Sequence, residues 1–138
     1  MWTTEHSTET GAAPEAIWRV WSDVERWPTW NADLERAELS GPFAAGSTIT
    51  MYQRGGDTIE LRIADACESD GFVDQADLGN IVVRTIHHLI PLTDGRIQVV
   101  YRMEISGPDA DTLGPPLGAA ISADFPQVLA GLIDRAEG

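Results

Sequence analysis

The stretch DTLGPPLGAAISADFPQVLAGLIDRAEG, residues 111–138, has the pattern of a long amphipathic helix. Its apolar residues recur at intervals of three and four, which is the period of one face of an α-helix. They are Leu113, Leu117, Ile121, Phe125, Val128, Leu129, Leu132, Ile133 and Ala136. Polar residues lie between them, as on the solvent face of a packed helix. Such a helix needs a surface to pack on, and the preceding residues predict a β-sheet that curls around it.

Prolines interrupt this helical pattern twice. Residues 115–116 are both proline and suit a first turn, so the helix proper is expected to begin near Leu117. Pro126 falls inside the periodic run, and the backbone hydrogen bond that it removes predicts a bend there. The bend has two interpretations, a tolerated kink or a flexible lid in which Leu117, Ile121 and Phe125 gate a cavity.

The rest of the chain predicts seven strands and two short helices. Pro14 suits the start of the first helix, and a second helical segment at residues 24–31 is broken by Pro28. Alternating apolar and polar residues between turn sequences predict the strands. These cover residues 3–10, 34–39, 47–53, 58–67, 72–78, 81–90 and 96–106. Because short turns join most of them, neighbouring strands are expected to pair antiparallel. The prediction is one α+β domain over residues 1–138, with a seven-stranded sheet wrapped around the C-terminal helix.

The composition limits the classes of function. The 138 residues carry 22 acidic and 9 basic side chains, a net charge of −13, and all the bases are arginine. Such a surface repels nucleic-acid phosphates and anionic membranes, so neither is an expected partner. The chain has no run of about 18 apolar residues and no signal-peptide pattern, so a cytoplasmic protein is expected. The single cysteine, Cys67, agrees with that compartment.

Adjacent histidines give one candidate for chemistry. His87 and His88 lie in a predicted strand and therefore point to opposite faces, so they cannot both bind one metal ion, and no metal is expected. We favour His87 as the inward residue because Val83 and Leu89 share its face, although strand register decides. Beside Tyr101 it would orient a ligand carbonyl or transfer a proton; the alternative is an ordinary hydrogen-bonded strand histidine. No cofactor motif is present, and no cofactor is expected.

Tryptophans cluster near the N-terminus. Four of the five, Trp18, Trp21, Trp27 and Trp30, fall within thirteen positions. Two interpretations are open. The tryptophans anchor the helical corner against the sheet, or one or two of them line a pocket and stack on a flat or apolar ligand.

The same region carries a family resemblance. PEAIW at residues 14–18 and WSDVERWPTWN at residues 21–31 resemble the opening of the polyketide cyclase/dehydrase branch of the START-related (SRPBCC, birch-pollen-allergen-like) superfamily. The turns near residues 41–47, 93–96 and 106–108 also resemble turns of that family. The resemblance implies the helix-grip fold with a cavity between helix and sheet, in which members bind or transform lipids, sterols, aromatic polyketides and similar molecules. The family shares no catalytic motif, so no catalytic residue is carried over.

These observations predict a largely apolar cavity that binds a small hydrophobic or aromatic molecule in a monomer or homodimer. The expected lining is Ile49, Met51, Leu61, Ile63, His87, Tyr101, Met103, Leu117, Ile121 and Phe125, with Trp30 near the mouth. Three functions compete: a carrier or sensor, a cyclase or dehydratase that uses His87 and Tyr101, and a protein-binding module. An inward His87 beside Tyr101 with a nearby acid would favour the enzyme. Absence of an inward acid–base pair would favour the carrier or sensor. A filled cavity together with an exposed apolar patch would favour the protein-binding module.

Overall fold

The computed structural model describes all residues from Met1 to Gly138, and its element order is the predicted one. Strand β1 (Trp2–Thr10) precedes helix α1 (Pro14–Ser22) and the 3-10 helix η1 (Val24–Thr29). The other strands are β2 (Leu34–Ser40), β3 (Thr48–Gln53), β4 (Thr58–Cys67), β5 (Gly71–Asp77), β6 (Val82–Pro91) and β7 (Ile97–Ser106). Helices α2 (Ala110–Ser122) and α3 (Phe125–Glu137) end the chain.

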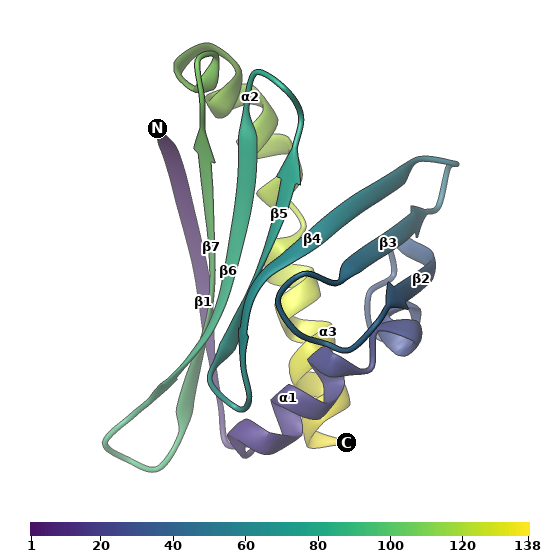
Figure 1. Ribbon diagram of the computed structural model, residues 1–138. Helices are drawn as coiled ribbons and strands as arrows, with labels where there is room; N and C mark the ends of the chain where they lie inside the picture. The colour runs from purple at the N-terminus through teal and green to yellow at the C-terminus, as the bar shows by residue number, and fades with distance from the viewer.

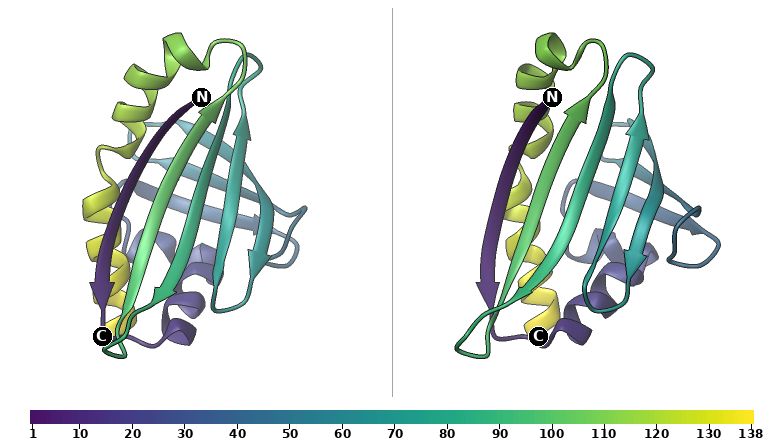
Figure 2. Two further views of the ribbon diagram at one scale, coloured as in Figure 1. Left: turned by 90° about the vertical axis from the view of Figure 1, so that its left-hand side faces the viewer. Right: turned by 60° about the vertical axis from the view of Figure 1, so that its left-hand side comes forward.

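The seven strands form one antiparallel sheet in the order β1-β7-β6-β5-β4-β3-β2. Figure 1 shows β2, β3 and β4 running at a steep angle to β1, β7 and β6. A register shift between Ile63 and Asp65 lies where β4 leaves β5, and such bulges bend a sheet. The sheet therefore curves, and Figure 2 shows α2 and α3 running along one side of it. The predicted helix-grip arrangement is confirmed.

The C-terminal helix differs from its prediction in two details. It begins at Ala110 rather than near Leu117, so the prolines at 115–116 lie inside α2. The two carbonyls that they leave without a helical partner belong to the exposed residues 111–112, where water can solvate them. The break between α2 and α3 falls at residues 123–124, so Pro126 lies in the first turn of α3, where its missing N–H costs nothing.

Glycines allow the two helices to approach their neighbours closely. Gly114 and Gly118 face the side chain of Trp2, and a Cβ atom at either position would collide with it. A Cβ atom at Gly131 would collide with the Trp30 carbonyl, so glycine at this position allows α3 to pack closely against the segment that follows η1. By length and hydropathy alone Ala110–Glu137 could also cross a membrane, a test that core helices of soluble proteins pass as well.

Candidate functional site

A cavity of about 690 Å³ lies between the sheet and the C-terminal helices. Of the 26 residues that line it, 18 are hydrophobic, so its walls are mainly apolar. They come from α1, η1, the segment between η1 and β2, strands β2 to β7, and both C-terminal helices. Leu78 and Ile121 line the cavity and are 58% and 38% exposed, which places them at its opening. The cavity is therefore open to solvent rather than filled by side chains.

The structure brings together most of the predicted lining and leaves three residues out. The eight that line the cavity are Trp30, Met51, Leu61, His87, Tyr101, Leu117, Ile121 and Phe125. Ile49, Ile63 and Met103 do not line it; each has no exposed surface and packs in the core. The side chains of these three residues point to the predicted face of the sheet, but other core residues pack directly against them there. The alternation of side chains along a strand shows which face of the sheet each one is on. It does not show where along the strand the sheet and the helices separate to leave a cavity.

Aromatic side chains form much of the wall. Trp21 donates its indole N–H to the Tyr101 hydroxyl at 3.1 Å, and Trp27 donates to the Trp21 carbonyl at 3.0 Å. The indole N–H of Trp30 is buried without a partner. These three tryptophans line the cavity, whereas Trp18 packs edge-on against Phe43. Trp21 and Trp27 are also part of the buried core, so the same side chains anchor the corner and line the cavity, and stacking on a ligand stays a prediction.

His87 is the inward-facing histidine, as predicted from the apolar residues that share its face of the strand. Its ring stacks on Phe72 with centroids 3.9 Å apart, and it lies edge-on to Tyr101 at 4.6 Å. Nδ1 lies 3.1 Å from the Phe72 carbonyl, which can only accept, so Nδ1 carries the proton. Burial lowers the pKa of His87 to about 3, and the imidazole is neutral and weakly basic. His88 points outward and lies 3.6 Å from Asp70.

Asp74 is a cavity residue that the sequence analysis missed. It lies on β5, is 7% exposed, and its carboxylate is 3.8 Å from His87 Nε2, beyond hydrogen-bond distance. No protein group donates a hydrogen bond to this carboxyl, and burial raises its pKa to about 7. The alternation of Phe72, Asp74 and Ala76 was the available signal, because those three side chains point inward together. An inward acid thus lies beside His87 and Tyr101.

Two further carboxyl groups lie at the mouth. Asp33 and Asp124 both line the cavity. Burial and the neighbouring Asp33 together raise the pKa of Asp124 to about 6. The cation among the lining residues is Arg54, whose Nε donates to the Ala32 carbonyl at 2.9 Å. With Asp74, the cavity has three carboxyl groups and one guanidinium group.

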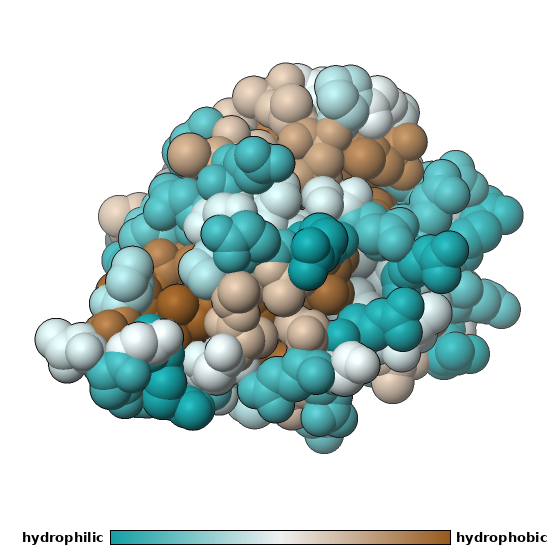
Figure 3. All heavy atoms as spheres, turned by 90° about the horizontal axis from the view of Figure 1, so that it is seen from below, coloured by the Kyte–Doolittle hydropathy of each residue, from teal (hydrophilic) through white to brown (hydrophobic).

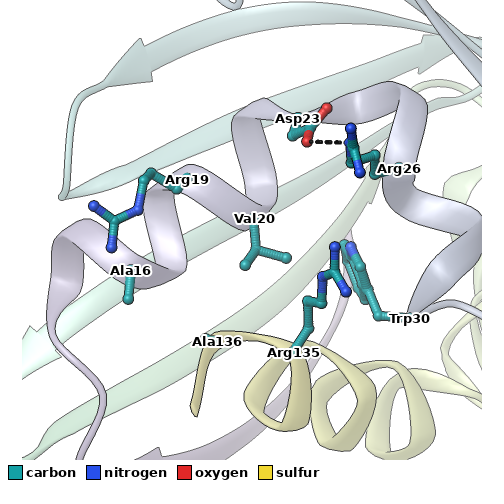
Figure 4. A pocket seen from close by; sticks show the side chains of 8 residues that line it. All are labelled: Ala16, Arg19, Val20, Asp23, Arg26, Trp30, Arg135 and Ala136. Carbon is teal, nitrogen blue, oxygen red and sulfur yellow. Dashed lines mark ion pairs between the residues drawn. The ribbon is translucent and has the colours of Figure 1, made fainter. Parts of the chain in front are cut away.

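A smaller hollow of about 250 Å³ lies outside this cavity, between α1 and α3. Figure 4 shows Arg19, Arg26 and Arg135 around it, with Trp30 at one side. Arg26 forms an ion pair with Asp23 at 3.2 Å. Seen from below, hydrophilic residues cover much of the surface and apolar residues are visible in the hollows between them (Figure 3). Because Trp30 lines both spaces, it separates an arginine-lined hollow from the acidic cavity.

Solved structures resemble this one over nearly the whole chain. Norcoclaurine synthase from Thalictrum flavum, in complex with dopamine and hydroxybenzaldehyde, superposes with a TM-score of 0.71 at 15% identity, covering 98% of this chain and 83% of that chain. A protein from Mesorhizobium loti gives 0.76 at 14% identity, covering 99% and 97%. A protein from Thermobifida fusca gives 0.71 at 20% identity, covering 99% and 93%. No protein-family model and no curated protein sequence matches the chain. These likenesses establish the fold, and the chain is a helix-grip protein.

Proposed function

We propose that this protein binds a small aromatic molecule in the cavity between the sheet and helices α2 and α3. The observation that carries the proposal is the open cavity of about 690 Å³ with mainly apolar walls that include three tryptophans, Phe72, Tyr101 and Phe125. Small-molecule sites commonly have volumes of about 300–1,000 Å³ and this composition. The neighbour from Thalictrum flavum, solved with dopamine and hydroxybenzaldehyde, supports the same class of ligand. The open cavity argues against a module whose core is filled.

A thermal-shift screen tests this proposal. The panel contains flat aromatic compounds, sterols, fatty acids and buffer alone. A ligand at about 100 times its dissociation constant stabilises the folded state by about 2.7 kcal/mol, which is a rise in melting temperature on the order of 10 °C. We expect that rise with aromatic compounds. No rise with any class would contradict the proposal.

A matched pair of variants tests whether the ligand binds inside the cavity. Ala76 lines it from β5, and its neighbour Gln75 points to the opposite face. Ala76→Trp should fill part of the cavity and reduce the shift, whereas Gln75→Trp should leave the shift unchanged. Equal effects would show that the ligand binds elsewhere.

The carboxyl group in the cavity favours a second candidate, acid–base catalysis on the bound ligand, as in a cyclase or dehydratase. A group with a pKa near 7 suits proton transfer at neutral pH, and burial places the pKa of Asp74 at about 7. Asp74 would accept a proton from the carbon beside a ligand carbonyl, while the Tyr101 hydroxyl would donate a hydrogen bond to the carbonyl oxygen. His87 is too weak a base for this task, because burial lowers its pKa to about 3.

Turnover separates this candidate from a carrier. A ligand found in the screen is incubated with the protein and its products are analysed. If the protein is an enzyme, Asp74→Asn should lower kcat by about 100-fold or more, the usual contribution of a general base. Asp134→Asn, which removes one exposed charge from α3, should leave kcat unchanged. Absence of product with every bound ligand would contradict catalysis and leave the binding function intact.

A further inference from the structure

We propose that the ligand is an aromatic amine whose ammonium group pairs with Asp74. This inference rests on the proposed binding function and narrows it to one chemical class. It also excludes fatty acids and carboxylated polyketides as preferred ligands.

The first argument is the missing partner of Asp74. Its side chain is 9% exposed, lines the cavity and receives no hydrogen bond from the protein. A buried carboxylate without a partner is costly, so buried acids are normally paired with a cation or with several donors. His87 does not provide that cation, because its proton is on Nδ1, facing the Phe72 carbonyl, and its Nε2 presents a lone pair. A ligand ammonium group in the cavity would supply the missing charge.

The second argument is the charge around the path to Asp74. The mouth contains Asp33 and Asp124, and Arg54 is the opposing cation. The whole chain has a net charge of −13. Apolar walls focus such a field, which attracts cations and repels anions. Three of the nine arginines lie instead around the hollow on the other side of Trp30, where they do not reach the cavity.

The third argument is the aromatic wall next to the carboxyl group. Phe72 and Tyr101 line the cavity together with Trp21. Aromatic faces attract ammonium groups and also stack on flat rings, so the same wall accommodates both parts of an aromatic amine. An aliphatic amine would leave most of this wall uncovered.

Three matched ligands test the inference by isothermal titration calorimetry. Tryptamine, 3-propylindole and indole-3-propionate share a ring and a chain but end in a cation, a methyl group and an anion. We expect tryptamine to bind at least tenfold more tightly than 3-propylindole, and indole-3-propionate to bind most weakly. Asp74→Asn should lower the affinity for tryptamine at least tenfold and change that for 3-propylindole less than threefold. Asp134→Asn, the matched loss of one exposed charge, should change neither.

The pH dependence provides a second readout. The charged and titratable groups that line the cavity with Asp74 are His87 on β6, Tyr101 on β7, and Asp33, Arg54 and Asp124. Because the Asp74 pKa is about 7, tryptamine affinity should rise as the pH increases towards 7 and then level off. A primary ammonium group stays protonated to about pH 10, so the ligand itself does not titrate in this range.

Each outcome decides the inference. Preferred and pH-dependent binding of tryptamine that requires Asp74 would support it. Equal or tighter binding of 3-propylindole would overturn it while the proposed binding function stands. Failure of all three indoles to bind would also overturn it, and the proposed function fails as well only if the wider thermal-shift panel is negative.

Discussion

The Asp74→Asn variant is expected to become more stable relative to the wild type as the pH rises. The difference between their free energies of unfolding should increase by about 4 kcal/mol from about pH 4 to about pH 7. Burial raises the pKa of this carboxyl from 3.8 to about 7. Between those values the folded protein holds a proton that the unfolded chain has released. The stabilising contribution of Asp74 is therefore complete below pH 3.8 and is lost as the pH rises through about 7. Asparagine keeps the shape of the side chain and cannot lose a proton.

Urea denaturation at a series of pH values measures this effect. The difference in free energy of unfolding between Asp74→Asn and the wild type should increase up to pH 7 and then stay constant. Asp134→Asn serves as the control, because it makes the same substitution at an exposed side chain on α3. A flat difference for Asp74→Asn would show that the Asp74 carboxyl is solvated in the folded state.

Replacing His87 with phenylalanine is expected to have the opposite pH dependence. Burial lowers the pKa of His87 from 6.5 to about 3. The contribution of His87 to stability is therefore complete above pH 6.5 and is lost as the pH falls through about 3. His87→Phe keeps a ring against Phe72 and removes this loss. Relative to the wild type, the variant should gain about 3 kcal/mol of stability between about pH 6.5 and about pH 4.

The opposite pH dependences of Asp74 and His87 are visible only in variants that replace one of the two residues. Between about pH 4 and 6.5 the folded pair holds one proton, on Asp74, and the unfolded pair also holds one, on His87. Because the numbers of bound protons are equal, their contributions to the pH dependence of the wild type nearly cancel.

The matched control for His87→Phe is His88→Phe, which places the same side chain on the outer face of the same strand. A rise in the relative stability of His87→Phe with increasing pH would contradict the assignment of a neutral, buried imidazole.

Local patterns were sufficient for most of the fold. The alternation of Ile97, Val99, Tyr101, Met103 and Ile105 predicted β7 and its inward face, and the structure confirms both. Turn residues separated the strands for a similarly local reason, since glycine adopts positive φ angles without steric cost and proline fixes its own φ angle. The bend of the C-terminal helix was predicted at Pro126 but lies at residues 123–124. Proline removes a hydrogen bond only when it lies beyond the first turn, and the sequence alone does not fix where a helix restarts.

The sequence by itself determined the order of elements, the face of each strand and the acidic charge, because these depend on neighbouring residues and on composition. Only the tertiary structure decided which inward residues line the cavity and which pack in the core. Met51 lines the cavity and Ile49 is buried, although they share a face of β3. The tertiary structure also decided the state of Asp74, because the free energy of a carboxyl group depends on what surrounds it in space. Residues far apart in the chain, from β5 to β7, bury Asp74 without supplying a cation, and no local pattern contains that information.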